Sequence, residues 1–147
     1  MAFEFKVQRR VEFSETDAAG IVHFSNFFRY MESVEHAFFR SLGHSVMWQS
    51  HQPPLGFPRV HASCDYKSPL RFEDLVEIHL LVREKRVRSL GYQIRFRNLT
   101  AHPVREVARG DLAVVCVSKN ADGTFTPVRI PHELADLIQP APPEALA

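Results

Sequence analysis

Residues 24–42 read FSNFFRYMESVEHAFFRSL, and their apolar side chains recur at spacings of three and four residues. That period is typical of an α-helix with one apolar face. The stretch therefore predicts an amphipathic helix of about five turns. Gly43 follows it directly, and glycine is the usual residue just past a helix end. The apolar face is wide and aromatic, so we expect it to be deeply packed; it comprises Phe24, Phe27, Phe28, Met31, Val34, Phe38 and Leu42.

Alternation of apolar and polar residues predicts strands on both sides of this helix. Residues 3–13 alternate strictly, which is typical of a half-buried strand. Four further strand-like segments lie at 59–67, 76–82, 90–97 and 104–118. The connections between these four leave no room for crossover helices, so their sheet must be antiparallel. One sheet must then cover one long helix. The sequence predicts the α+β class, with a curved antiparallel five-stranded sheet wrapped around a single central helix.

Length and composition limit the number of domains and the classes of function. A chain of 147 residues fits one domain. We expect that domain to span residues 1–139, followed by a frayed tail at 140–147, where periodicity is lost. The 18 basic and 17 acidic residues nearly balance, which argues against a dedicated nucleic-acid binder. No apolar run approaches the roughly 20 residues of a membrane span. The N-terminus has no signal-peptide pattern, so a cytoplasmic location is predicted.

The residues before the helix carry a candidate active site. Residues 11–31 read VEFSETDAAGIVHFSNFFRYM, and Asp17 lies in the loop between the first strand and the helix. A helix N-terminus has unpaired N–H groups and about half a positive charge, which stabilise a developing oxyanion. A carboxylate a few residues upstream can be held near the same carbon. The segment can thus supply both a nucleophile or base and an electrophilic clamp; the alternative role for Asp17 is a turn or capping carboxylate.

This segment resembles the signature of the 4-hydroxybenzoyl-CoA thioesterase family, which includes the Tol-Pal-cluster acyl-CoA thioesterases and has the hotdog fold. Weaker matches follow at 74–78, 85–89, 122–123 and 130–131. The resemblance implies an acyl-CoA thioesterase that releases a free acid and CoA. Asp17 would be its catalytic carboxylate, and the backbone N–H of Phe24 would polarise the carbonyl. Direct attack by Asp17 and activation of water both stay open. CoA is part of the substrate, and no cofactor is implied.

Positions 23 and 24 depart from the family pattern, because His-Phe stands where Tyr-His or Trp-Tyr is usual. Only the backbone of Phe24 can then act. His23 is either a polar group beside the carboxylate or an ordinary loop histidine. Asn26 either caps the helix or orients water or substrate. For Glu15, a solvated loop charge is the expectation.

A basic hairpin supplies candidate substrate-binding residues. Residues 83–97 contain six basic side chains and one acid, Glu84. Arginine binds phosphate through charge-assisted hydrogen bonds, and coenzyme A carries three phosphates. By the resemblance, Arg86 and Arg88 contact the nucleotide, with Lys67 and Arg59 as weaker candidates; a solvated strand face is the alternative. The eight histidines show no metal-ligand spacing, so no metal site is predicted.

Two other functions compete with hydrolysis. A hydratase or dehydratase of acyl thioesters would need a histidine paired with a helix carboxylate, here His23 with Glu32 or Glu35. A non-catalytic acyl-CoA-binding module would use the same pocket. The acyl group stays open: the phenylalanines near the helix start suit an aromatic or a short to medium aliphatic chain, or they simply form core. The resemblance also implies a homodimer or homotetramer, in which the strands at 59–68 of two copies pair.

Overall fold

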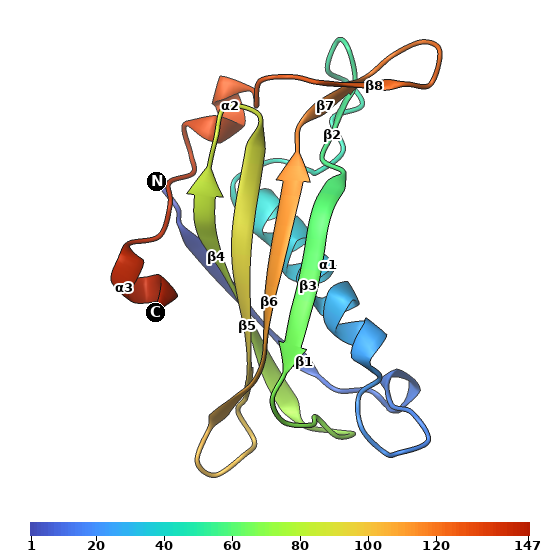
Figure 1. Ribbon diagram of the computed structural model, residues 1–147, viewed down its shortest axis with the longest axis vertical. Coiled ribbons are helices and arrows are strands. Elements are labelled where there is room, and N and C mark those ends of the chain that lie inside the picture. Colours follow the sequence, from blue (N-terminus) through green and yellow to red (C-terminus); the bar gives the residue numbers. More distant parts are fainter.

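The computed structural model describes all residues 1–147 and confirms the predicted architecture. Figure 1 shows the long helix α1 (Phe24–Ser41) lying across one face of a curved sheet. The sheet is antiparallel, with strand order β1-β4-β5-β6-β3. Its strands are β1 (Glu4–Arg10), β3 (Arg59–Tyr66), β4 (Leu75–Lys85), β5 (Ser89–Asn98) and β6 (Arg105–Val115).

The other elements are short, and all except the C-terminal helix, which lies beside the middle of β5, are found near the ends of the sheet. A small second sheet joins β2 (Leu55–Gly56), β7 (Val117–Lys119) and β8 (Phe125–Pro127). The chain also forms a 3-10 turn, η1 (Phe13–Glu15), and the helices α2 (His132–Ala135) and α3 (Pro143–Leu146). The first strand is shorter than the expected 3–13, because a capping box between Glu12 and Glu15 turns the chain into η1. None of the helices has the length and hydropathy needed to cross a membrane.

The expectation of a frayed tail at 140–147 is wrong. Helix α3 lies within this segment, and Ala141 is buried with its N–H donating to the Val82 carbonyl at 2.7 Å. The side chains of Gln93 and Arg95 on β5 donate to the carbonyls of Leu146 and Ala147 at 3.3 and 2.6 Å. A four-residue helix is too short to show a period, so the alternation test missed it.

The apolar face of α1 is the centre of the core. Phe27, Met31, Val34 and Phe38 are all buried against the sheet, as the spacing of three and four predicted. Gly43 has φ +84°, the left-handed value that ends the helix. Phe24 is the exception, because it is 61% exposed at the start of the helix. Its ring is therefore available at the surface instead of contributing to the core.

One carboxylate is buried inside this core. Glu35 on α1 has 0% exposure, and its Oε1 accepts a hydrogen bond from Arg59 Nη2 at 2.7 Å. Its Oε2 has no hydrogen-bond partner. Burial raises the pKa of Glu35 to about 7, and the positive charge of Arg59 offsets only part of that effect. Glu35 therefore takes up a proton near neutral pH.

This buried carboxylate predicts a pH-dependent stability. The pKa of Glu35 in the folded chain, about 7, lies above the ordinary value of 4.5. The folded state thus binds more protons between these values, so the free energy of unfolding falls as pH rises through this window. Relative to Glu35→Gln, the wild type should lose on the order of 2–3 kcal/mol between pH 5 and pH 8. Urea unfolding of both proteins at the two pH values measures this, and parallel pH profiles would contradict it.

Candidate active site

The loop between η1 and α1 holds Asp17 in a defined position. Thr16 and Val22 form an antiparallel bridge at its base, and the Asp17 N–H donates to the Ile21 carbonyl at 2.9 Å. Gly20 donates its N–H to the Asp17 carbonyl at 2.9 Å and has φ +79°, a conformation that glycine adopts without strain. Asp17 Oδ1 accepts the Ala19 N–H at 2.8 Å, which leaves Oδ2 without a protein partner. The half-buried carboxylate is therefore fixed through one oxygen and free at the other.

The start of α1 leaves one backbone donor free. His23 is the N-cap: its Nδ1 accepts the Ser25 N–H at 3.3 Å, and its carbonyl accepts the Asn26 N–H at 2.9 Å. The N–H of His23 itself donates to the Glu15 carbonyl at 2.9 Å. The N–H of Phe24 has no acceptor in the protein. A free donor thus lies at the positive end of an 18-residue helix.

Asp17 and Phe24 line the same cavity of about 440 Å³. Its walls are mainly apolar and come from the loop, the helix and the end of β3; they include Val22, Phe27, Tyr66 and Leu70. A cavity of this size is within the range of small-molecule sites. A carbonyl compound bound here could place its oxygen toward the free N–H, while the carboxylate acts on the carbonyl carbon or on a water.

Tyr66 is a site residue that sequence reasoning missed. Its hydroxyl donates to the Phe24 carbonyl at 3.0 Å, and its ring packs edge-on against Phe27 with centroids 5.1 Å apart. Burial raises the pKa of Tyr66 to about 12, so the phenol remains a donor at neutral pH. Its place at the end of an alternating strand is the only sequence signal. This signal does not reveal that the Tyr66 hydroxyl reaches the start of α1.

His23 and Asn26 do not line the Asp17 cavity. The His23 ring is held by Ser25 and stacks on Phe24 with centroids 4.5 Å apart. Asn26 is not the N-cap; its Nδ2 donates to the Glu15 carbonyl at 2.8 Å. The pairs required for a hydratase are also absent: with 1.5 Å of rise per residue, Glu32 and Glu35 lie roughly 13 and 18 Å along the helix from His23.

Lys67 lies in the cavity wall at the end of β3. Its ammonium group forms an ion pair with Glu106, which also binds Arg109 at 3.0 Å. The Lys67 N–H donates to the Val107 carbonyl at 2.8 Å, so the backbone at this wall is fixed. The structure therefore brings Lys67 together with Asp17 and Phe24.

Arg86 and Arg88 lie elsewhere. They are exposed in the turn between β4 and β5, beside α2, and Figure 1 shows this turn at the opposite end of the sheet from the start of α1. Arg86 Nε donates to Glu84 at 2.7 Å. Arg86 also lines a cavity of about 390 Å³ with Lys85, Arg129 and His132. Within one chain, the predicted phosphate-binding residues and Asp17 are thus separated.

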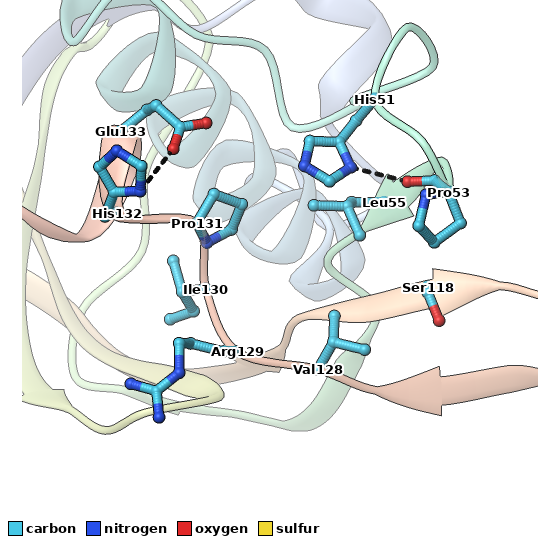
Figure 2. Close-up of a pocket in the computed structure, with 10 residues that line it drawn as sticks. All are labelled: His51, Pro53, Leu55, Ser118, Val128, Arg129, Ile130, Pro131, His132 and Glu133. Carbon is cyan, nitrogen blue, oxygen red and sulfur yellow. Dashed lines mark hydrogen bonds and ion pairs between the residues drawn. The ribbon is translucent and has the colours of Figure 1, made fainter.

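A second cavity of about 390 Å³ adjoins this basic one and shares Arg129, Ile130 and His132 with it. Figure 2 shows its apolar side chains, Leu55, Val128 and Ile130, with the Arg129 guanidinium pointing away from His51. The two histidines are engaged locally: His51 Nδ1 bonds to the Pro53 carbonyl and His132 Nδ1 to Glu133, both at 2.8 Å. Sequence reasoning missed Arg129, because the cavity is assembled from distant segments.

The histidines do not gather into a metal site. No group of three or more His, Cys, Asp or Glu side chains is arranged to hold a metal ion. Cys64 and Cys116 are free thiols, and burial raises the pKa of each to about 11. Neither sulfur is therefore an activated nucleophile.

Comparison with known proteins gives a consistent result. Residues 19–103, more than half of the chain, match the sequence model of the thioesterase superfamily. A 1,4-dihydroxy-2-naphthoyl-CoA hydrolase of Parasynechococcus marenigrum (strain WH8102) is 33% identical over 82 residues, which is 51% of this chain and 54% of the relative. The chain spans between 54% and 64% of the length of the first curated relatives that it matches.

Solved structures extend the similarity over almost the whole chain. A gentisyl-coenzyme A thioesterase superposes with a TM-score of 0.74 at 30% identity, covering 90% of this chain and 98% of that one. The 4-hydroxybenzoyl CoA thioesterase of Pseudomonas sp. strain CBS-3 superposes with a TM-score of 0.83, covering 92% and 99%. At 22% identity, this second likeness shows a shared fold alone.

Proposed function

Because the chain belongs to the thioesterase superfamily and has its hotdog fold, we propose that it hydrolyses acyl-CoA thioesters to a free acid and coenzyme A. The observation that carries this proposal is that Asp17 and Phe24, whose N–H has no acceptor in the protein, line one cavity of about 440 Å³. A carboxylate and a positioned N–H donor are the two groups that thioester hydrolysis requires.

These groups allow two routes of thioester hydrolysis. In the first, Asp17 attacks the carbonyl carbon, the thiolate leaves and takes a proton from water, and a second water hydrolyses the mixed anhydride. In the second, Asp17 takes a proton from a water that attacks the carbonyl, and the departing thiolate receives that proton. In both, the Phe24 N–H stabilises the negative oxygen of the tetrahedral intermediate. The reaction needs no cofactor, since CoA is part of the substrate.

We propose an aromatic acyl group as the preferred substrate class. The cavity is lined by three aromatic rings, those of Phe24, Phe27 and Tyr66, and the similar proteins include hydrolases of 1,4-dihydroxy-2-naphthoyl-CoA and gentisyl-CoA. Aromatic side chains favour ring substrates through edge-to-face and stacked contacts. Short and medium aliphatic chains are the alternative. The cytoplasmic location that the sequence predicts stays a prediction.

A panel of acyl-CoA thioesters tests the function. Purified protein is mixed with benzoyl-, 4-hydroxybenzoyl-, butyryl-, octanoyl- and crotonyl-CoA, and free thiol is measured. Hydrolysis predicts thiol release, fastest with the aromatic thioesters. Water addition to crotonyl-CoA without thiol would indicate a hydratase. Saturable binding without any reaction would indicate a binding module.

We also propose that the active unit is a C2 dimer, or a tetramer built from such dimers. Strand β3 is an edge strand that pairs only with β6, and exposed edges tend to be covered. If two β3 strands pair antiparallel, the Arg59 end of one copy lies beside the Tyr66 end of the other. This would bring the cavity lined by Arg86 and Arg129 in one copy toward the Asp17 cavity of its partner. Light scattering at micromolar concentration tests this arrangement, and a monomer would contradict it.

Removal of both arginines at the β4–β5 turn should weaken substrate binding. In Arg86→Ala/Arg88→Ala, we expect KM for acyl-CoA to rise about tenfold or more, because charge-assisted phosphate contacts are lost. The kcat should change less, since such contacts are equally strong in the ground and transition states. A pantetheine thioester, which lacks the nucleotide, serves as the control substrate. Equal losses on both substrates would refute a role in phosphate binding.

A further inference from the structure

Another cavity, with a mainly polar lining, is formed by residues of β1, η1 and α1. It has a volume of about 310 Å³, and its lining includes Arg9, Glu15, Asn26 and Tyr30. It shares no lining residue with the cavity of Asp17. Neither the proposed reaction nor the family comparison assigns a role to Arg9, Glu15 or Tyr30. Glu15 lies at their centre and is only 8% exposed, which corrects its expected place as a solvated loop charge.

Every polar atom of Glu15 is engaged. Its carboxylate Oε2 accepts Arg9 Nε and Nη2 at 2.8 and 2.6 Å, and its Oε1 accepts the Glu12 N–H at 2.8 Å. Its own N–H donates to the Glu12 carbonyl at 3.0 Å. Its carbonyl accepts two donors, the His23 N–H at 2.9 Å and Asn26 Nδ2 at 2.8 Å. The carboxylate side of Glu15 thus holds β1, and the carbonyl side holds the start of α1.

These same contacts stabilise the ionised form of the Glu15 carboxylate. Burial alone would raise the pKa of Glu15, but the hydrogen bonds from the Glu12 backbone and from Arg9 outweigh it, so the pKa lies below its ordinary value. Arg9 also lies over the Tyr30 ring, with its Cζ 5.5 Å from the ring centroid. The ion pair is therefore a fixed connection between the sheet and the loop.

Through its position in the chain, Glu15 links this ion pair to the residues of the candidate active site. Asp17 follows two residues later, and His23, which receives the carbonyl contact, directly precedes Phe24. The bond from the His23 N–H to the Glu15 carbonyl closes the loop that carries Asp17, just outside the bridge of Thr16 and Val22. Movement of Glu15 would change the position of the Asp17 carboxylate relative to the Phe24 N–H.

We propose that Glu15 is a positioning residue for thioester hydrolysis: with Arg9 and Asn26 it fixes the loop of Asp17 against the first turn of α1. This inference rests on the proposed function for its effect on rate. It does not make Glu15 a catalytic residue, because Glu15 does not line the substrate cavity. A displacement of about 1 Å in an active site can lower the rate of the chemical step about 100-fold.

Three variants test this role. Glu15→Ala removes the carboxylate contacts, whereas Glu15→Gln keeps the side-chain shape and one acceptor oxygen. Glu4→Gln is the matched control, because it alters another carboxylate contact on β1, the hydrogen bond of Glu4 with His79 at 2.6 Å. We expect kcat to fall about 10- to 100-fold in Glu15→Ala and less in Glu15→Gln, with KM nearly constant. In Glu4→Gln, kcat should not change. Unchanged kcat in folded Glu15→Ala would overturn the proposal.

A double variant separates positioning from an independent contribution. If Glu15 acts through Asp17, then Glu15→Ala should lower kcat no further in an Asp17→Asn background. Multiplying losses would instead show that Glu15 acts on its own and would refute the assignment. Should Glu15→Ala fail to fold, Glu15→Gln takes its place in both comparisons.

Amide hydrogen exchange supplies a readout that does not depend on activity. The N–H groups of Asp17, Gly20 and His23 should exchange at least about tenfold faster in Glu15→Ala, with the amides of β5 unaffected. Unchanged loop exchange would contradict the proposal even if kcat falls. If the wild type hydrolyses no acyl thioester, the proposed function fails, and the exchange data alone decide whether Glu15 fixes the loop.

Discussion

Replacement of Asp17 by asparagine is expected to lower kcat by at least about 100-fold, the range typical of losing a positioned base or nucleophile. Asparagine keeps the size of the side chain and an oxygen that can accept the Ala19 N–H, as Asp17 Oδ1 does at 2.8 Å. The loop should therefore keep its shape, and acyl-CoA binding and the melting temperature should change little. Stopped turnover with intact binding would locate the defect in the chemical step.

The chain offers a matched control for this variant. Asp122 forms the same kind of turn, because its Oδ1 accepts the N–H of Thr124, two residues on, at 2.9 Å. Asp122→Asn should therefore report the effect of the substitution on a turn alone. If Asp17 were only a turn residue, Asp17→Asn would leave kcat near the wild-type value, as we expect for Asp122→Asn. That outcome would exclude Asp17 from the reaction.

The largest expected effect on stability is that of Phe38→Ala. Phe38 on α1 has 0% exposure and packs against Phe5 of β1 with ring centroids 6.3 Å apart. Truncation removes a buried ring and leaves a cavity between helix and sheet. Such substitutions cost about 3–5 kcal/mol, a large share of the 5–15 kcal/mol that stabilises a typical domain. Urea unfolding of the wild type and the variant measures the difference.

Phe125→Ala is the control for this experiment. Phe125 on β8 is 59% exposed, so its truncation should change the free energy of unfolding by no more than about 0.5 kcal/mol. A loss below about 1 kcal/mol in Phe38→Ala would contradict the tight packing of α1 on the sheet. The comparison thus tests the core that the spacing of residues 24–42 predicts.

The elements with a clear burial period could be predicted from the sequence. Helix α1 and strands β4 to β6 were recognisable because each buries apolar residues, and the period of those residues records that burial. Strand β3 was recognised from its alternation, although none of its residues is buried in the single chain. The order of these elements then required an antiparallel sheet. The tail at 140–147 escaped this reasoning. It is held by single hydrogen bonds, such as that from Ala141 to Val82 at 2.7 Å, and these leave no period in the sequence.

The candidate site was predictable only where its residues are neighbours in the chain. Asp17 and Phe24 lie seven residues apart in one motif, and both line one cavity. Tyr66 and Arg129 join their cavities through tertiary contacts, so no local pattern marks them. The true environment of Glu15 depends on Arg9, which projects from a strand that precedes the turn. The sequence alone therefore indicated a solvated charge at Glu15, and only the fold shows that Arg9 pairs with it.

Product analysis in H₂¹⁸O tests the central claim, hydrolysis of an acyl-CoA thioester, most directly. The wild-type protein is incubated with benzoyl-CoA over many turnovers, and both products are analysed by mass spectrometry. The account predicts free CoA and benzoate in equal amounts, with one oxygen of each benzoate carboxylate derived from the solvent. Benzoyl-CoA and the other aromatic and aliphatic thioesters recovered intact, or thiol released without the corresponding acid, would contradict it.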